Sequence, residues 1–451
     1  MNNGFSNCKI VKTGGISMPK KIMKKIILCI LLTAAALWAN SCGAANTAEP
    51  VTELREEQSP EPEPTTKKPK ATEAESQVEK SVKPTLIGST FLSKDRYCIA
   101  GKAAEHAVIT IEGALEPVQS KVINGMFVCE VFLEKQKTED VELRVYAKNA
   151  GRDLSDPLVI NVSKDEPRDS KPVYVGKKNH LQYEYTLDDY LGINLFSENE
   201  LESMRKGAEK LQQKLTDAGL KTELVIFIAP NPATIYPENM PDFLVEQKAG
   251  NDSRSKQIAQ AFEDSDIKAI FPYQRLLQEK RDYMMYYWAD THWNELGAYY
   301  GYCELFEYIG EKFPDAKPIP ESEIDISETT IYGGDIVSNM LFFDSNSYPS
   351  MTTLARVKNP KAIRTELVGD PGMGSEIWVK EDGKERPAVV MYRDSFSVAM
   401  LGFISETAGK FFVNPMWDFN INMDYLKQIN PDYLIIEKVE REARGFLEVL
   451  R

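Results

Sequence analysis

The sequence predicts an α/β three-layer sandwich with a mostly parallel sheet, preceded by an all-β domain. Between residues 170 and 451, apolar runs such as 222–228 and 388–392 alternate with helical patterns. The runs are continuous, as is typical of strands buried on both faces, and strand–helix alternation favours a parallel sheet covered by helices on each side. Over residues 84–163, short segments of period two are separated by turn residues, and this pattern predicts antiparallel strands.

The first 41 residues have the pattern of a bacterial export signal. A basic stretch is followed by the apolar run Ile26–Trp38, which is shorter than a membrane span of roughly 20 residues, and then by the small residues Ala39–Ser41. Cys42 comes next, an order that resembles a lipobox. We therefore predict that residues 1–41 are a lipoprotein signal peptide, that Cys42 is lipidated, and that the protein is a membrane-anchored extracytoplasmic lipoprotein. The alternative is ordinary signal cleavage, with Cys42 an unmodified thiol.

The composition excludes several classes of protein. The formal net charge is −14, and loss of the six lysines in residues 1–41 would bring it to −20. Such an acidic chain is a poor candidate for binding nucleic acid or an anionic membrane surface. Only Cys98, Cys129 and Cys303 remain for the folded part, which excludes a disulfide scaffold, and no Cys-x-x-Cys or Cys/His cluster indicates zinc. We expect neither a metal nor another cofactor.

Residues 42–83 are rich in Glu, Pro, Thr and Lys, with the alternating segment Pro60–Pro64 near their centre. They contain too little apolar surface to offset the entropy that is lost when a chain is ordered. We therefore predict a disordered linker, partly extended by its prolines. A linker between a lipid anchor and a folded body would hold that body away from the membrane.

Residues 84–165 are expected to form an all-β domain of five or six strands. Asn124-Gly125 is a hairpin-type turn, and after it Phe127 and Cys129 point to the same inward face. Cys98 lies on the opposite phase from its apolar neighbours, which argues against a disulfide bridge to Cys129. The pattern resembles bacterial immunoglobulin-like modules, which usually act as spacers or binding domains, so we assign no chemistry here. The expected strands are Tyr97–Ala100, Ala107–Gly113, Phe127–Leu133, Val141–Ala147 and Leu158–Val162.

The C-terminal part, residues 170–451, is expected to alternate between helices and strands. The segment Ser197–Glu200 is a capping box that begins a helix, and Thr222–Ile228 is a strand that leads into the loop of Asn231. The further expected elements are a strand at Tyr283–Trp288, a helix at Asn294–Lys312, a strand at Ala388–Tyr392, a helix at Ser395–Ala408, strands at Phe411–Val413 and Tyr433–Ile436, and between these a helix at Met423–Ile429.

Three polar segments directly follow expected strands: Asn231, the pair Asp290 and His292, and Ser395. In an open parallel sheet, ligands bind beyond the carboxyl ends of the strands, so we expect these segments to meet at one edge. Ser395 would occupy a strand-to-helix turn that exposes its hydroxyl, and Asp394 would brace that turn. The alternative is that Ser395 only caps the helix, as serine often does.

Asp290, His292 and Ser395 are the residue types of a serine acyl-transfer centre. His292 would take the proton of the serine hydroxyl, and Asp290 would hold the imidazole Nδ1–H so that Nε2 is the basic atom. One alternative is a histidine that is simply packed beside a tryptophan. Another is that the Asp-x-His pair is half of a metal site, although the chain's other two histidines, His106 and His180, offer no partner pattern for it.

Five blocks of the C-terminal part occur together and in the same order in a known family: Tyr174–Gly176, Ile228–Pro241, Tyr287–Ala298, Met391–Phe396 and Pro431–Arg441. Through them, residues 170–451 resemble the DHHW family and the SGNH hydrolase-like domain of alginate O-acetylation proteins. In that family the Asp-x-His pair precedes the serine, a circular permutation of the ordinary SGNH order. The resemblance implies an SGNH hydrolase-like catalytic domain in which Asp290 orients, His292 is the base and Ser395 is the nucleophile.

The sequence departs from the family pattern at three positions. Arg393 stands where many relatives have glycine, Pro232 where a lysine is common, and Thr291 where the name-giving motif has its first histidine. Arg393 would narrow the site or bring charge to it. None of the three changes removes the triad.

Four residues near these motifs are candidates for substrate binding: Trp293, Asn231, Tyr236 and Arg393. Trp293 and the aromatic segment Tyr286–Trp288 would offer surfaces on which sugars stack. Aromatic clusters of this kind are more often part of a core, and that alternative stays open.

The resemblance implies acetyl transfer to hydroxyls of an extracellular or cell-wall polysaccharide through an acetyl-serine intermediate. Backbone N–H groups at Ser395 and Phe396 would hold the oxyanion. The expected partners are a polysaccharide acceptor and a membrane acyltransferase that delivers the acetyl group. Two alternatives remain open: a carbohydrate acetylesterase with the same triad, and a catalytically inactive glycan-binding lipoprotein.

Overall fold

The computed structural model describes residues 78–135, 139–280, 284–416 and 421–450. The predicted signal peptide, the lipidation site Cys42 and the linker as far as residue 77 lie outside the described residues.

Residues 78–83, which the sequence assigns to the linker, already pair with the all-β part. Lys80 forms a parallel bridge with Asp153, and the Ser81 N–H donates to the Asp153 carbonyl oxygen at 2.8 Å. The hydroxyl of Ser81 accepts from the Asn149 N–H at 2.9 Å. The folded region thus begins before residue 84, because this pairing uses backbone groups and leaves no apolar pattern in the sequence.

The all-β part consists of seven strands in two antiparallel sheets. One sheet contains, in spatial order, β1 (Thr85–Phe91), β2 (Arg96–Lys102) and β5 (Met126–Phe132), and the other contains β4 (Val118–Lys121), β3 (Val108–Glu112), β6 (Val141–Lys148) and β7 (Leu158–Val162). Tyr97 and Phe127 of the first sheet share one apolar core with Ile109 and Val145 of the second. The two sheets therefore form a sandwich. Of its strands, β1 and β4 were not expected from the sequence.

The turn at Asn124 and Gly125 has the predicted conformation. Their φ angles of 54° and 72° are those of a type I′ turn, which closes the bridge between Ile123 and Met126. Cys129 lies in the sandwich core, whereas Cys98 faces a separate apolar cluster. Both thiols are buried and free, as the strand phase predicted.

The C-terminal part is built on a seven-stranded sheet. Its strands are, in spatial order, β11 (Lys268–Ile270), β10 (Glu223–Ala229), β18 (Tyr433–Val439), β16 (Ala388–Arg393), β17 (Lys410–Pro415), β15 (Ser375–Val379) and β14 (Ile363–Val368). Neighbours from β11 to β17 pair in parallel, and β15 and β14 extend the sheet by antiparallel pairing. The mostly parallel sheet is as predicted.

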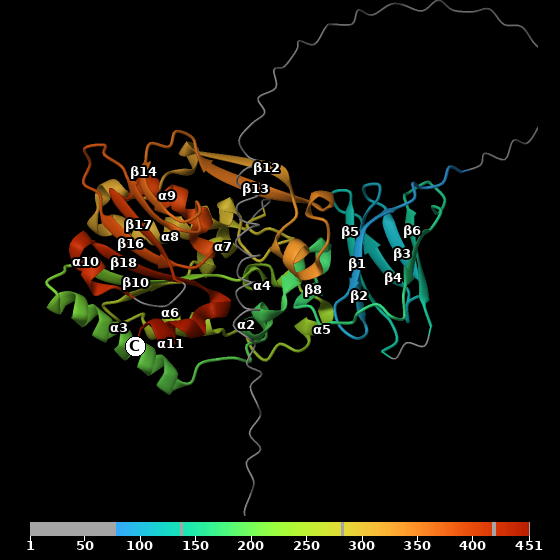
Figure 1. Cartoon of the computed structure of the whole chain (residues 1–451), viewed down its shortest axis with the longest axis horizontal. Coiled ribbons are helices and arrows are strands. Elements are labelled where there is room, and N and C mark those ends of the chain that lie inside the picture. The colour runs from blue at the N-terminus through green and yellow to red at the C-terminus, as the bar shows by residue number, and fades with distance from the viewer. Residues whose placement is uncertain (1–77, 136–138, 281–283, 417–420, 451) are drawn as a thin grey trace, which may run out of the picture. The chain divides into compact units, whose positions relative to one another are not determined.

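Helices cover both faces of this sheet (Figure 1). One face carries α3 (Glu198–Asp217), α6 (Arg254–Ala261), α10 (Met423–Ile429) and α11 (Phe446–Val449), and the other carries α7 (Tyr273–Glu279), α8 (Glu295–Lys312) and α9 (Leu401–Thr407). Along β10, Leu224 and Ile226 pack toward the first group, whereas Val225 and Phe227 pack toward the second. Successive residues must all be apolar because a strand's side chains alternate between faces. The predicted three-layer sandwich is confirmed.

Shorter elements complete this part of the chain. They are β8 (Val173–Val175), β9 (Leu181–Tyr183), α2 (Leu187–Leu191), α4 (Pro232–Ile235), α5 (Asp242–Val245), the hairpin of β12 (Ile324–Tyr332) and β13 (Pro349–Val357), and the short helical turns η6 (Ile336–Leu341), η8 (Phe396–Met400) and η9 (Glu440–Gly445). No helix or strand was predicted from the sequence for the region from β12 to β15.

The predicted helix starts are confirmed at both long helices. Ser197 accepts from the Glu200 N–H and Glu200 reaches back to the Ser197 N–H, which completes the capping box of α3. The side chain of Asn294 accepts from the Leu296 and Gly297 N–H groups at 3.1 Å each and so caps α8. These bonds satisfy backbone donors that a helix leaves unpaired at its start.

The predicted strand at Tyr283–Trp288 is wrong in the described portion, residues 284–288. Only an isolated bridge between Tyr286 and Trp293 is present. The aromatic side chains that suggested a strand instead anchor a loop: the Tyr286 hydroxyl donates to the Pro230 carbonyl oxygen at 2.8 Å, and the Met285 N–H donates to the Tyr236 hydroxyl at 3.0 Å. Asp290 and His292 therefore follow a buried loop rather than a strand.

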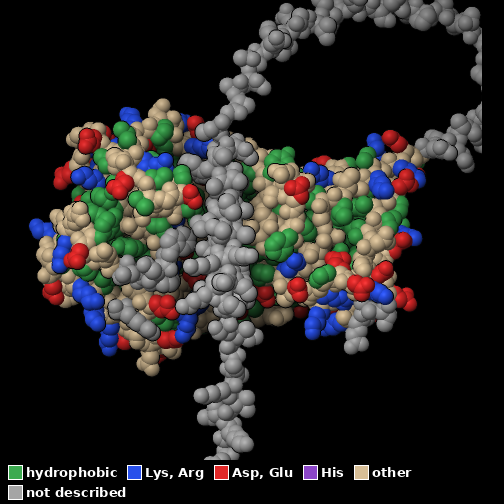
Figure 2. Space-filling view, in the orientation of Figure 1, with side chains coloured by type: hydrophobic (Ala, Val, Ile, Leu, Met, Phe, Trp, Pro, Cys, Tyr) green, Lys and Arg blue, Asp and Glu red, His purple; other side chains and the backbone are tan. Residues whose placement is uncertain are grey.

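In the view of Figure 2, acidic and basic side chains are interspersed over the described surface, and no large area carries charge of a single sign. Within the described ranges, no helix has both the length and the apolar content needed to cross a membrane.

Candidate active site

The turn that carries Ser395 is held by Asp394. The Asp394 carboxylate accepts from the Phe396 N–H at 2.8 Å and from the Val439 N–H at 2.7 Å, and the Asp394 N–H donates to Glu437 at 2.9 Å. These bonds join the carboxyl ends of β16 and β18 and leave Ser395 at the start of η8. Its hydroxyl makes no capping bond to that helix, so the alternative that Ser395 is only a cap is wrong.

One expected oxyanion donor is not free. The Phe396 N–H is bound to the Asp394 carboxylate, so it cannot donate to an oxyanion without losing that bond. Among the described residues, the Ser395 N–H has no hydrogen-bond partner. Of the two predicted donors, only the Ser395 N–H is therefore available.

The three predicted triad side chains lie in one hydrogen-bonded row. His292 Nε2 is 2.8 Å from Ser395 Oγ, and His292 Nδ1 is 2.7 Å from Asp290 Oδ1. With Nδ1–H donating to the carboxylate, Nε2 is left to accept from the serine hydroxyl. The His292 side chain is 27% exposed and the Asp290 side chain 11%, so the row is shielded but reachable from solvent.

The imidazole lies beside Phe396 of the serine turn, which Trp293, the next residue in the chain, also contacts. Trp293 is buried, and its indole N–H donates to the Phe396 carbonyl oxygen at 2.7 Å. The His292 ring lies 4.8 Å from the Phe396 ring, measured between centroids. The base and the nucleophile are thus tied together through one tryptophan and one phenylalanine as well as through their own hydrogen bond.

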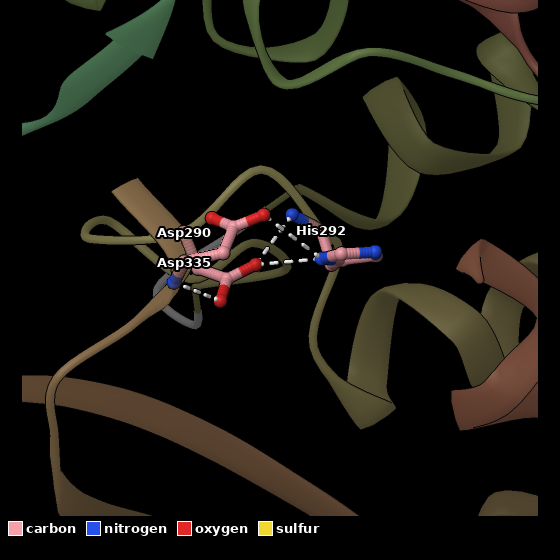
Figure 3. Close-up of side chains that lie close together, drawn as sticks. All are labelled: Asp290, His292 and Asp335. Carbon is pink, nitrogen blue, oxygen red and sulfur yellow. Dashed lines mark hydrogen bonds and ion pairs between the residues drawn. The ribbon is translucent and has the colours of Figure 1, made fainter. Parts of the chain in front are cut away.

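A second carboxylate, Asp335, stands beside the pair of Asp290 and His292 (Figure 3). Asp335 accepts from the Thr291 N–H at 2.7 Å and from the Thr291 hydroxyl at 2.5 Å, and its own N–H donates to Asp290 Oδ2 at 2.8 Å. Asp335 Oδ2 lies 3.7 Å from His292 Nδ1. In Figure 3 both carboxylates point toward the same nitrogen of the ring.

Burial and charge shift the pKa values of all three groups. Burial alone would lower the pKa of His292, but the negative charge and hydrogen bond of Asp290, followed by the charge of Asp335, raise it above the usual 6.5. Burial opposes ionisation of Asp290, yet contact with His292 lowers the pKa of Asp290. Burial and the charge of Asp290 raise the pKa of Asp335 to about 7. The site therefore stabilises a protonated imidazole next to Asp290.

Asp290, His292 and Asp335 also form a set of oxygen and nitrogen atoms within 4.8 Å of one another, which could hold a metal ion. Each group, however, already has hydrogen-bond partners: His292 Nδ1 binds Asp290, and the Asp335 carboxylate binds Thr291. A cation on Nδ1 would have to replace the hydrogen bond that orients the ring. The arrangement therefore fits a serine centre better than a metal centre.

Residues 185–369 match the family model described as the SGNH hydrolase-like domain of acetyltransferase AlgX. This part of the chain is therefore similar to the SGNH hydrolase-like domain of AlgX. The match includes Asp290, His292 and Asp335, whereas Ser395 lies beyond its end. No curated protein matches the chain.

Several solved structures are similar to this chain. A DHHW family protein from Eubacterium siraeum has a TM-score of 0.43 and 13% identity, over 68% of this chain and 94% of that one. PatB1 from Bacillus cereus has a TM-score of 0.43 and 15% identity, over 55% and 92%. The O-acetyltransferase domain of AlgJ from Pseudomonas putida has a TM-score of 0.39 and 16% identity, over 61% and 92%.

The four candidate substrate-binding residues are buried. Arg393 and Asn231 are 0% exposed, Trp293 is 1% and Tyr236 is 7%. None presents a face on which a sugar could stack, so these positions differ from the expectation. Trp293 and Tyr236 instead hold backbone groups of the turns around the site, because a buried aromatic side chain with a polar end can anchor a loop.

Arg393 does not bring charge to the surface of the site. Its guanidinium donates to the carbonyl oxygens of Gly372 and Asp394, and burial lowers the pKa of Arg393. Negative charge on Glu437, Asp394 and Glu376 opposes this lowering. The arginine that replaces the family's glycine therefore fills space behind the serine turn.

Asn231 lies at the same sheet edge as the serine turn, as predicted. Its N–H donates to Glu440 at 2.9 Å, directly after β18, and Glu440 also accepts from the hydroxyls of Thr234 and Ser253 at 2.6 and 2.9 Å. Burial and the charge of Asp189 raise the pKa of Glu440 to about 7. The two amide atoms of the Asn231 side chain are buried without a partner among the described residues.

Asp335 and Glu440 were not assigned a role from the sequence. Glu440 belongs to a block of the family resemblance, but the block gives no indication of its three hydrogen bonds. The signal for Asp335 is the preceding pair Gly333-Gly334, whose φ angles are 82° and 134°. A side chain at Gly334 would lie 2.2 Å from the Ala289 carbonyl oxygen, so this glycine marks a close approach of two backbones.

Proposed function

We propose that this protein is an O-acetyltransferase that modifies hydroxyls of an extracellular or cell-wall polysaccharide. The observation that carries the proposal is the row in which Ser395 Oγ lies 2.8 Å from His292 Nε2 and His292 Nδ1 lies 2.7 Å from Asp290. The match to acetyltransferase AlgX supports acetyl as the transferred group. The resemblance to alginate O-acetylation proteins supports a polysaccharide as the acceptor.

The first half-reaction acylates the serine. Ser395 Oγ attacks the carbonyl carbon of an acetyl ester while His292 Nε2 takes the hydroxyl proton. The Ser395 N–H, which has no partner among the described residues, is the proposed donor to the oxyanion. The bond to the leaving oxygen then breaks, and His292 returns the proton to that oxygen.

The second half-reaction transfers the acetyl group. A sugar hydroxyl attacks the acetyl-serine carbonyl and gives its proton to His292. The ester bond to Ser395 breaks, and His292 returns the proton to Ser395 Oγ. If water attacks instead, the same residues hydrolyse the ester, which is the acetylesterase alternative.

Two measurements test this proposal. A fluorophosphonate, which labels activated serines, should label the full-length protein but not the Ser395→Ala variant, and the labelling should persist in EDTA because no step uses a cation. Acetate release from 4-nitrophenyl acetate should then fall, and acetylated sugar should appear, when a polysaccharide-derived oligosaccharide is added. Equal labelling of the parent and the Ser395→Ala variant would exclude an enzyme that uses Ser395 as its nucleophile. Acetate release that stays the same when an oligosaccharide acceptor is added would favour the esterase.

Labelling is also expected to depend on pH. His292 acts as a base only when it is neutral, and its pKa is raised above 6.5 by Asp290 and Asp335 against the effect of burial. The labelling rate should therefore rise with pH and reach half of its maximum above pH 6.5. Rates measured from about pH 5 to pH 9 would contradict this if the profile were flat or if its midpoint lay below 6.5.

The location and domain plan of the protein are part of the same proposal. Residues 1–41 and Cys42 would export and anchor the chain, and the linker would carry its domains. We infer that the seven-stranded sandwich is an immunoglobulin-like module, because sheets of three and four antiparallel strands around one core are the arrangement of that class. A membrane acyltransferase would supply the acetyl group.

A further inference from the structure

Asp335 takes no part in the triad, yet it contacts every residue of the segment that carries the base. We propose that Asp335 is a positioning residue that fixes the Asp290–His292 segment and, as a second carboxylate, stabilises the imidazolium that forms when Ser395 is deprotonated. This inference rests on the proposed function, because it concerns the same base.

The first part of the argument is geometric. The Asp335 N–H donates to Asp290 Oδ2, so it holds the carboxylate that orients the ring. The Asp335 side chain accepts from both the N–H and the hydroxyl of Thr291, the residue between the orienting acid and the base. Asp335, which lies 44 positions after Thr291 in the chain, thus binds the segment 290–292 through both its own backbone N–H and its own carboxylate.

The placement of Asp335 depends on two glycines. The Gly333 N–H donates to the Tyr348 carbonyl oxygen at 2.9 Å, and Gly334, with φ of 134°, lies against the Ala289 backbone. The connection between β12 and β13 can approach the segment this closely only because Gly334 has no side chain. This close approach brings the Asp335 side chain to the base.

The second part of the argument is electrostatic. Two carboxylates face one imidazole nitrogen, Asp290 at 2.7 Å and Asp335 at 3.7 Å (Figure 3). Other charged or titratable groups also interact with this site. The positive charge of Arg441 of η9 opposes protonation of His292. Beyond the effect of burial, the charge of Asp335 raises the pKa of Tyr183 of β9, and the charge of Asp290 raises the pKa of Tyr287. A positive imidazolium gains from a second negative charge at this distance, particularly where water is partly excluded.

Thr291 contributes its side chain as well as its backbone to this arrangement. The family's name-giving motif has a histidine at that position, and here a hydroxyl donates to Asp335 Oδ2 at 2.5 Å. The oxygen that accepts this bond, Asp335 Oδ2, is the same oxygen that lies 3.7 Å from His292 Nδ1, so the threonine hydroxyl fixes the carboxylate oxygen that faces the base.

The experiment compares three variants of the full chain. Asp335→Asn keeps the size of the side chain but removes its charge, and Thr291→Val removes one hydrogen bond but keeps the charge. Asp344→Asn is the matched control, because Asp344 lies in the same connection but is exposed, and within the described part of the chain its carboxylate accepts hydrogen bonds only from its neighbours Asn346 and Ser347. Each variant is measured by NMR titration of its imidazoles, which is practical with only three histidines, and by the rate of fluorophosphonate labelling against pH.

The pKa of His292 should fall in Asp335→Asn, because a negative charge is lost, and the labelling midpoint should move to lower pH. The maximal labelling rate should fall by about an order of magnitude, as for loss of a group that acts through the base rather than as the base. Thr291→Val should slow labelling with a smaller change in the His292 pKa, and Asp344→Asn should match the parent.

Two outcomes would overturn the inference. One is an unchanged His292 pKa in Asp335→Asn, even if thermal stability drops, because Asp335 would then be merely structural. The other is an unchanged labelling rate in that variant while Ser395→Ala still abolishes labelling. If Ser395→Ala leaves labelling intact, the proposed function itself fails, and the NMR titration still reports whether Asp335 acts on His292.

Discussion

Replacement of His292 by alanine should slow acylation of Ser395 about 10⁶-fold, as expected when the histidine of a serine triad is removed. His292 Nε2 is 2.8 Å from Ser395 Oγ and is the group positioned to take the hydroxyl proton. Without it the serine is an ordinary alcohol with a very small fraction of alkoxide. The measurement is the rate of fluorophosphonate labelling at a pH above the His292 midpoint.

The control for this variant is His106→Ala. The His106 side chain is 90% exposed and belongs to the all-β part, so its removal should leave labelling unchanged. A His292→Ala variant that labels within about tenfold of the parent, while its circular dichroism spectrum is unaltered, would show that another group activates the serine.

Replacement of Asp290 by asparagine should lower the labelling rate about 10⁴-fold, the size of effect expected when the orienting acid of a triad is neutralised. The asparagine amide can donate to Nδ1, which would favour the imidazole tautomer with its proton on Nε2, and a protonated Nε2 cannot accept from Ser395. The loss of charge also lowers the pKa of His292, since Asp290 raises it. The labelling rate of the Asp290→Asn variant should thus be lower than that of the parent at every pH.

A small effect of Asp290→Asn would have a specific meaning. Asp335 lies 3.7 Å from the same ring nitrogen, so a loss of less than about a hundredfold would indicate that Asp335 has taken over the orientation of the ring. The double variant Asp290→Asn with Asp335→Asn separates these cases. If the double variant is labelled as fast as Asp290→Asn alone, Asp335 does not orient the ring in place of Asp290.

The sequence predicted those strands, turns and helix starts that depend on residues close together in the chain. The continuous apolar run of β10 predicted a strand buried on both faces, and Leu224 and Val225 indeed pack on opposite sides of the sheet. The turn at Asn124-Gly125 and the capping box at Ser197 were predicted because each depends on bonds within a few residues.

Features set by distant contacts were missed. Tyr286 looked like part of a strand because aromatic residues favour strands, but its hydroxyl binds Pro230, 56 residues away in sequence. The Phe396 N–H was expected to be free, and only the fold shows that the Asp394 carboxylate reaches it. Asp335 meets Thr291 across 44 residues, a pairing that no local spacing could indicate.

The sequence predicted which residues form the candidate site, but it did not predict which of them are exposed. Asp290, His292 and Ser395 stand in motifs with recognisable chemistry, and the structure brings their side chains together. Trp293 and Arg393 lie in the same motifs but are buried, because burial depends on the packing of the surrounding turns rather than on residue type.

The most direct test of the account is to find the acetyl group on the enzyme. The full-length protein would be mixed with 4-nitrophenyl acetate, quenched in acid and digested, and the acetylated peptide would be identified by mass spectrometry. The account predicts acetyl on Ser395 in the parent and none there in the His292→Ala variant. Acetyl on another residue only, or equal acetylation of Ser395 without His292, would contradict it.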